Sequence, residues 1–330
     1  MLRKTLVAYA LGLSFAAPMV FAEEGDGTTA QRAQNVVDVI ERPGVLTPRG
    51  KWSFDTSFSY SQNSANRVSV IGYTVLPSLL VGLIEVSDSD RTTMTLGFTG
   101  RYGITNATEI EVRVPYVYRN DQISERSLTE GSDEPTNFSL DGGGMGDIEF
   151  AMRHQFNFES APYWVGGLRV KSDSGRSPYE IDVDENNNFT EAPTGSGFWS
   201  VEPNISMIYP SDPAVLYANL SYIYNFEDEK RVGDRNDDIQ LGDTISIGGG
   251  IGFAVNPRLS FSLGLSHRTI FKSQVNGSTA PNAKVLQLDY LNFGVNYKIN
   301  ERTSINVGGQ AGLTEDAPDF QLTIRVPFNM

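Results

Sequence analysis

The chain has 330 residues, and its 26 lysines and arginines against 40 aspartates and glutamates give a formal net charge of −14. This acidic balance argues against a nucleic-acid partner, because binding to phosphates needs a basic surface. The absence of cysteine excludes disulfide bonds, thiol nucleophiles, cysteine metal ligands and a cysteine-linked lipid anchor.

Residues 1–22 have the pattern of a signal peptide. Arg3 and Lys4 precede an apolar stretch that ends at Ala17, and Val20-Phe21-Ala22 offers small residues where a signal peptidase cuts. The stretch is too short to span a bilayer core of about 30 Å as a helix. We therefore expect export and cleavage after Ala22.

Residues 23–49 are expected to form a periplasmic segment ahead of the membrane domain. Within it, residues 28–40 place Val36, Val37 and Ile40 at helical spacing. Two interpretations stay open. The short N-terminal helix lies in the periplasm, or it is a plug that enters the pore and occludes it.

From Trp52 onward, apolar and polar residues alternate. Between Trp52 and Tyr60 every second residue is aromatic or apolar, apart from Thr56, and the residues between are polar. Such alternation is typical of a strand with one face in lipid and the other in water. The pattern recurs in twelve segments long enough to cross a bilayer: 52–60, 93–102, 109–119, 148–156, 164–171, 199–209, 216–226, 245–253, 259–266, 291–297, 305–313 and 320–328.

Short and long connections alternate between these segments. Tight turns rich in Asn and Pro separate some pairs, and long polar stretches, interpreted as flexible loops, separate most of the others. This order predicts an all-β, antiparallel up-and-down transmembrane β-barrel over residues 50–330, with both chain ends in the periplasm. Residues 68–86 are also apolar and fit either a hairpin raised above the membrane or two more strands. Charges at Asp88, Asp90 and Arg91 favour the raised hairpin, hence twelve strands rather than fourteen.

Ionisable residues stand between the lipid-facing ones and should point inward. An unpaired charge in a dry core costs several kcal/mol, so this lining should be wet, paired or both. A salt-bridge network that braces the wall and a polar conduction path are compatible interpretations. The predicted pore-lining residues are Arg101, Glu111, Arg113, Glu149, Arg153, Arg169, Glu202 and Arg325.

The sequence offers no catalytic constellation. His154 and His267 fall on lipid-facing positions near strand ends. The Gly-rich segment 141–147 lacks the lysine and the following helix of a phosphate loop, so we interpret it as a flexible loop. Segment 182–186 resembles only the first half of a calcium loop. We expect a protein that is not an enzyme and has no cofactor or resident metal.

Four segments carry a resemblance to a known family: Glu41-Arg-Pro-Gly-Val-Leu-Thr-Pro-Arg-Gly50, Arg101-Tyr-Gly-Ile-Thr105, Glu111-Val-Arg-Val-Pro-Tyr116 and Gly146-Asp-Ile-Glu-Phe150. They resemble segments of outer-membrane channels of the phenol meta-pathway degradation-like family. Within the family the chain looks most like the channels that export functional-amyloid subunits. That resemblance implies twelve strands, a trimer and a periplasmic helix that plugs the lumen. Residues 28–40 would then be the plug, and the wall charges its dock.

The chain departs from the export channels in one respect. They carry a long N-terminal coiled coil, whereas only residues 23–49 separate the expected cleavage site from the barrel. Trimerisation and substrate capture through that element are therefore not implied.

Our first hypothesis is a gated channel of the bacterial outer membrane that moves a polypeptide or a polar solute outward. The alternatives are an uptake porin for small aromatic or hydrophobic compounds and a closed structural or adhesive barrel. The expected partners are outer-membrane lipid and the transported molecule, and the resemblance adds a homotrimer.

Overall fold

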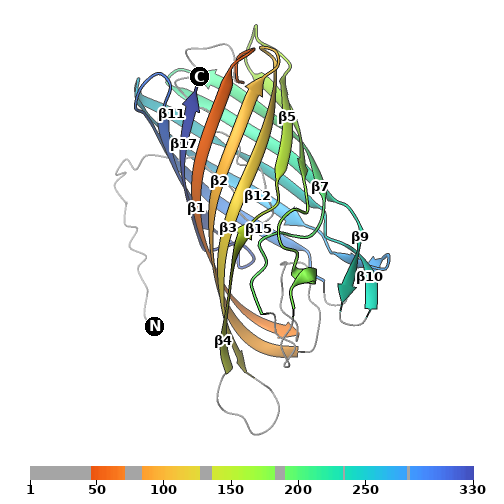
Figure 1. Ribbon diagram of the computed structural model, residues 1–330. Helices are drawn as coiled ribbons and strands as arrows, with labels where there is room; N and C mark the ends of the chain where they lie inside the picture. Colours follow the sequence, from red (N-terminus) through yellow and green to blue (C-terminus); the bar gives the residue numbers. More distant parts are fainter. Residues whose placement is uncertain (1–45, 71–83, 127–135, 183–189, 233–234, 281–282) are drawn as a thin grey trace, which may run out of the picture.

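A computed structural model describes residues 46–70, 84–126, 136–182, 190–232, 235–280 and 283–330, and it shows a closed antiparallel β-barrel (Figure 1). Twelve strand positions form its wall. The strands, in order around the wall, are β1 (Trp52–Val70), β2 (Ile84–Gly103), β3 (Thr108–Arg126), β5 (Glu149–Gln155), β6 (Tyr163–Lys171), β7 (Ser200–Ser211), β8 (Ala214–Asn225), β11 (Thr244–Asn256), β12 (Leu259–Ile270), β15 (Leu286–Lys298), β16 (Ser304–Gly312) and β17 (Phe320–Asn329). β4 (Thr136–Met145) continues the β5 position toward the end of the barrel opposite the C-terminus, and it pairs with β3.

The last strand closes the wall onto the first. β17 pairs with β1 from Ser53 opposite Asn329 to Gln62 opposite Phe320. Closure leaves no open sheet edge in lipid, where an unpaired backbone N–H or C=O costs several kcal/mol. The prediction of twelve antiparallel strands is confirmed. In the described part of the chain, no helix is both long and apolar enough to cross a bilayer.

The two ends of the barrel differ. The C-terminus and the short turns lie at one end, and β4, β9 (Asp228–Val232), β10 (Arg235–Gln240) and the short helix η1 (Pro178–Glu180) lie at the other (Figure 1). With β13 (Gln274–Val275) and β14 (Ser278–Thr279), β9 and β10 make a separate four-stranded sheet. Short turns mark the periplasmic side of such barrels and long loops the outer side. We therefore call the end with the short turns the periplasmic end and the end with the long loops the outer end.

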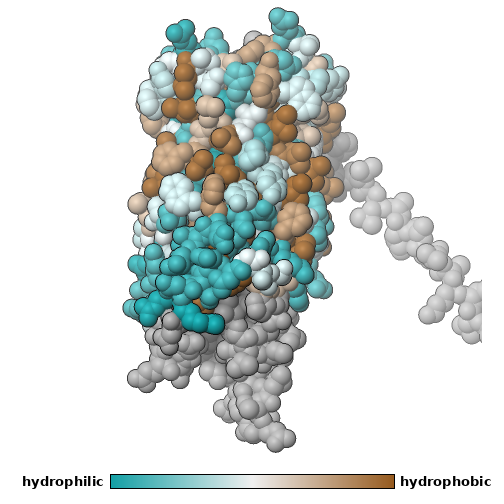
Figure 2. All heavy atoms as spheres, turned by 90° about the vertical axis from the view of Figure 1, so that its right-hand side faces the viewer, coloured by the Kyte–Doolittle hydropathy of each residue, from teal (hydrophilic) through white to brown (hydrophobic). Residues whose placement is uncertain are grey.

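Exposure along the wall is the reverse of that in a water-soluble protein. On β1, Trp52 and Phe54 are 48% and 43% exposed, whereas Ser53 and Asp55 are 1% and 3% exposed. On the face drawn in Figure 2, most of the hydrophobic residues lie over the upper part of the barrel, above a hydrophilic region near the outer loops. An apolar outer face and a polar inner face are the arrangement of a membrane-spanning barrel.

The outer loops carry more strand than predicted. The raised hairpin is present as far as the structure describes it, with Val70 opposite Ile84. By contrast, the interpretation of segment 141–147 as a flexible loop is wrong in part, because β4 includes residues 141–145. β3 also runs on to Arg126, beyond residue 119 where the predicted strand ends. The reason is that strands beyond the bilayer have no lipid face. The apolar alternation therefore stops while the backbone pairing continues.

Candidate functional site

A network of ion pairs lies along one half of the interior. Glu111 on β3 contacts Arg101 on β2 and Arg153 on β5. Arg101 also lies 3.5 Å from Asp55 on β1, through its Nη2 and the Oδ2 of the carboxylate. Arg325 on β17 contacts the same carboxylate. These pairs form a continuous chain across five neighbouring strand positions.

A second group of pairs extends the network. Glu149 on β5 lies 3.2 Å from Arg113 on β3 and 3.6 Å from Arg169 on β6. Arg169 in turn lies 3.3 Å from Glu202 on β7. Cross-strand register brings these partners together, since Arg113 is opposite Glu149 and Arg169 is opposite Glu202. Each of the eight predicted pore-lining residues belongs to one of the two groups, and a role in conduction stays a prediction.

The pairs are largely buried, and bracing of the wall by them stays a prediction. Arg101 and Glu111 are only 3% and 8% exposed, and breaking a buried ion pair by removing one partner costs about 3–5 kcal/mol. Two described network members lie outside the eight predicted residues: Glu109, 3.2 Å from Arg153, and Asp55, which stands on the polar face of the first strand. The signal for Asp55 was a carboxylate among serines at alternate positions.

The other half of the interior is lined mostly by small or uncharged side chains. Tyr217 on β8 lies over the neighbouring strands, where a Cβ at Gly250 or Gly264 would come within 2.4 or 2.6 Å of its hydroxyl. Glycine at these positions makes room for the aromatic ring against the wall. Arg268, 4% exposed on β12, is a charged exception.

The chain before β1 enters the periplasmic end of the barrel. The backbone N–H of Thr47 donates to Glu109 Oε2 at 2.7 Å, and Leu46 packs against Val165 on the inner face of β6. The predicted signal peptide and the candidate plug helix 28–40, with Val36, Val37 and Ile40, lie outside the described residues. The plug stays a prediction.

The wall is interrupted between β4 and β5. Outward-facing positions are odd-numbered on β4, as at Met145, and even-numbered on β5, as at Phe150, because both Gly146 and Asp147 lie on the buried side. One additional residue switches the faces of a strand in this way. β6 pairs with β5 up to Lys171 but has no pairing with β4. Beyond this level, β4 therefore lacks a wall partner on that side.

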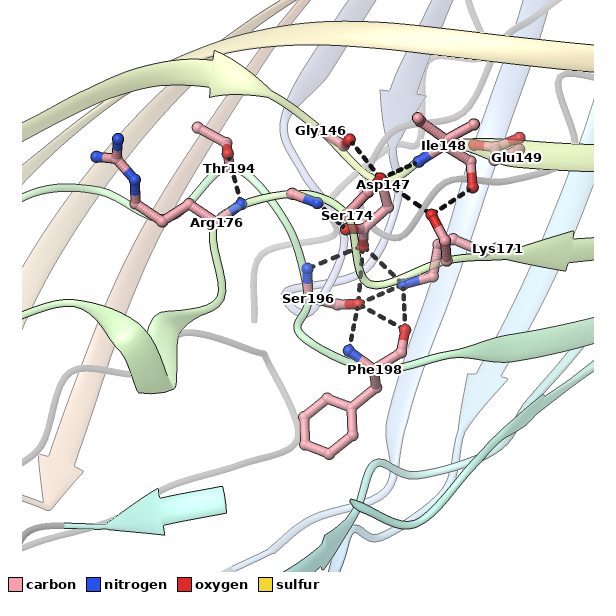
Figure 3. Close-up of polar contacts among 12 residues, drawn as sticks. Gly146, Asp147, Ile148, Glu149, Lys171, Ser174, Arg176, Thr194, Ser196 and Phe198 are labelled. Atoms are coloured by element: carbon pink, nitrogen blue, oxygen red, sulfur yellow. Dashed lines mark hydrogen bonds and ion pairs between the residues drawn. The ribbon is translucent and has the colours of Figure 1, made fainter. Parts of the chain in front are cut away.

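Segments 172–182 and 190–199, here called the inner loop, lie against this interruption (Figure 3). The N–H of Ala192 donates to the carbonyl of Asp141, and the hydroxyl of Thr194 donates to the carbonyl of Met145. A Cβ at Gly142 would lie 2.1 Å from the Ala192 carbonyl oxygen. The close approach of the loop to β4 therefore depends on glycine.

Asp147 is the polar centre of the interruption (Figure 3). Its carboxylate accepts hydrogen bonds from the backbone N–H of Gly175 at 2.9 Å and of Ser196 at 3.0 Å. It also accepts from the Ser196 hydroxyl at 2.9 Å and from Lys171 Nζ at 3.0 Å. Because segment 141–147 was interpreted as a flexible loop, Asp147 was not identified as a candidate site residue from the sequence. The Asp-Gly pattern alone does not reveal which distant groups a carboxylate will meet.

Phe198 holds the inner loop from the other side. Its ring is fully buried in a cluster with Ile239, Leu241 and two alanines, which packs against Val232 and Val275 of the four-stranded sheet. The ring of Tyr179 meets it edge-on, with 5.7 Å between centroids. Burial raises the pKa of the Tyr179 hydroxyl above its usual value. The loop thus has an apolar attachment at Phe198 in addition to its polar attachments at Asp147 and along β4.

The histidines occupy peripheral positions. His154 lies 2.9 Å from the Thr108 hydroxyl, and His267 lies 2.6 Å from Asp289 with 42% of its side chain exposed. Within the described residues, no group of three or more histidines, aspartates or glutamates could hold a metal ion. Part of the segment compared with a calcium loop lies outside those residues.

Comparison with known proteins gives a family match that covers the interruption. The family described as "Putative MetA-pathway of phenol degradation" matches residues 137–329, more than half of the chain. The chain belongs to this family. The matched region runs from β4 through the Asp147 cluster to the closing strand, which confirms the broader resemblance seen in the sequence.

Among solved structures, the COG4313 outer membrane channel from Pseudomonas putida F1 aligns with a TM-score of 0.60 at 14% identity, covering 87% of this chain and 97% of that chain. The Pseudomonas putida toluene transporter TodX aligns less closely, with a TM-score of 0.42 at 10% identity and coverage of 89% and 93%. The translocator domain of the Neisseria meningitidis autotransporter NalP gives 0.43 at 7% identity, with coverage of 89% and 93%.

The fold is thus that of an outer-membrane channel. Together with the lipid-facing belt, it confirms the expected location in the bacterial outer membrane. The narrower resemblance to amyloid-subunit export channels, with its trimer, gains no support from the family and the structures matched here.

Proposed function

We propose that this protein is an uptake channel for small apolar or aromatic molecules, which it releases sideways into the membrane through the interruption between β4 and β5. The position of the interruption carries the proposal. It lies beside Tyr116 and Met145, which pair across β3 and β4 and are 55% and 51% exposed on the lipid side. It also lies immediately on the outer side of Glu149, where the charged network begins.

The charged network is a barrier to an apolar solute. A molecule coming from the outer end would meet Arg113, Glu149 and Arg169 directly below the interruption. Passing between them would disturb buried, paired charges at a cost of several kcal/mol. Leaving sideways into lipid avoids that cost, because lipid solvates an apolar molecule well.

The outer part of the interior suits an apolar solute. Leu286, Leu288 and Tyr290 on the inner face of β15 form a buried cluster with Ile270 at the outer ends of these strands. The family description refers to phenol degradation, which supports aromatic compounds as the substrate class. Export of a polypeptide has less support, because the inner loop and the charged network would both have to leave its path.

The proposal is tested in a Gram-negative host that expresses the protein. The apolar probe N-phenyl-1-naphthylamine fluoresces when it reaches lipid, and it should enter faster than in the same host with an empty vector. Swelling of vesicles that contain the purified barrel measures passage of a neutral sugar in parallel. Equal probe entry with and without the protein contradicts the proposal, and sugar passage without probe entry favours a polar-solute channel.

A further inference from the structure

We infer that Asp147 is a positioning residue that holds the inner loop across the wall interruption, and that its carboxylate sets how often the interruption opens. The inference rests on the proposed function for its consequence in transport. The placement of the loop by Asp147 can be tested separately.

The contacts of Asp147 join parts of the chain that are otherwise separate. Gly175 comes from the outgoing limb of the inner loop, Ser196 from the returning limb and Lys171 from the end of β6. Asp147 itself stands between β4 and β5. One carboxylate therefore attaches both limbs of the loop to the two sides of the interruption.

The two limbs pass the carboxylate as closely as a backbone permits. A Cβ at Gly195 would lie 2.4 Å from Asp147 Oδ1 and 2.7 Å from the Cα of Gly175. A Cβ at Gly175 would lie 2.9 Å from the same oxygen. Only glycine allows these approaches. The backbone of both limbs is therefore packed directly against the carboxylate.

The charge of Asp147 is matched within the cluster. Lys171 is 4% exposed and Asp147 is 8% exposed, so both ions are removed from bulk water. The ammonium group also contacts the Ser196 hydroxyl and lies 3.4 Å from the Phe198 carbonyl oxygen. Replacing the carboxylate by an amide removes the negative charge that Lys171, the Ser196 hydroxyl and two backbone N–H groups contact, which favours states in which the loop has moved away.

Outside the cluster, the inner loop forms few other side-chain hydrogen bonds with the wall. Ser174 bonds the backbone at Gly146 and Ile148, and Thr194 bonds Met145. These are neutral hydrogen bonds, and hydrogen bonds to a charged group are about twice as strong. Asp147 is therefore the attachment whose loss should matter most for the position of the loop.

The first test measures loop position without transport. The chain has no cysteine, so Ala192→Cys introduces one thiol at a fully buried position of the loop. A membrane-impermeant maleimide should label this variant slowly. Adding Asp147→Asn should speed labelling at least about tenfold, the factor expected when hydrogen bonds to a buried charge are lost. Asp173→Asn is the matched control, because it removes the same charge from an exposed side chain of the same loop, and it should leave the rate unchanged.

Each preparation must migrate differently before and after boiling, which shows that the barrel has folded. Adding Lys171→Met to Asp147→Asn should change the labelling rate little further, since residues that act together are not additive. An unchanged rate in folded Asp147→Asn overturns the inference. So does an equal rise in the Asp173 control.

The second test measures transport with the apolar probe. If folded wild-type protein passes no probe, the proposed function fails, while the labelling result still decides the role of Asp147. If wild type passes the probe, Asp147→Asn should pass it several-fold faster. Equal or slower passage in that variant overturns the inference and leaves the proposed function standing.

Discussion

Tyr116 and Met145 are direct partners across β3 and β4, and both side chains face lipid at the level where the wall is interrupted. Directly beyond this pair, the Gly146 N–H donates to the Pro115 carbonyl at 2.9 Å, which is the last bond before β5 takes over the pairing with β3. Proline has no N–H, so the reciprocal ladder bond cannot form. The sequence of β3 thus contributes to the interruption opposite it.

Substituting Gly142 should displace the inner loop. Gly142→Ala puts a Cβ where the Ala192 carbonyl oxygen now lies, so the loop must move away from β4. Labelling at Ala192→Cys should speed up in the folded barrel. Gly143→Ala is the control, because its Cβ would meet nothing closer than 3.5 Å. If both variants label at the wild-type rate, the contact between loop and strand is weaker than described.

Removing the centre of the ion-pair network should destabilise the barrel. Glu111→Ala deprives Arg101 and Arg153 of a shared partner, and we expect a loss of about 3–5 kcal/mol in the free energy of unfolding. Denaturant titration in lipid vesicles measures the loss. Glu315→Ala, at an exposed loop position, should change stability by less than about 0.5 kcal/mol. Equal losses would show that the network does not brace the wall.

The lipid-facing assignment of β5 can be tested at Phe150, which is 48% exposed. Phe150→Arg places a charge in the hydrocarbon layer and should cost about 2–4 kcal/mol, or less near an interface. Phe150→Leu keeps an apolar side chain there and should be nearly neutral. Folding yield into vesicles, followed by migration with and without boiling, reports both. A stable arginine variant would argue against contact with lipid.

The apolar attachment of the inner loop depends on Phe198. Phe198→Ala empties a fully buried position, and large-to-small changes of this kind cost about 3–5 kcal/mol. We expect faster hydrogen exchange at the inner-loop amides, with exchange in the wall strands unchanged. The matched control is Phe226→Ala, since that ring is 45% exposed. Unchanged exchange in the loop would assign the attachment to Asp147 alone.

Much of this protein follows from its sequence. Alternation such as that around Trp52 and Phe54 is a local pattern with a period of two, and it specifies which face meets lipid wherever a strand crosses the bilayer. The same period places Arg101 and Glu111 on the inner face. Closure into twelve strands follows because an open edge cannot persist in lipid.

The sequence did not reveal the interruption or its contents. Asp147 lies in a glycine-rich segment with no periodic pattern, and its donors come from residues 24 to 49 positions away. Only the tertiary structure brings Lys171, Gly175 and Ser196 to one carboxylate, because the course of a long loop depends on close approaches between distant parts of the backbone. The alternation of apolar and polar residues reports whether each strand residue faces lipid or the interior. The contacts of the inner loop depend instead on which distant segments the folded chain brings together.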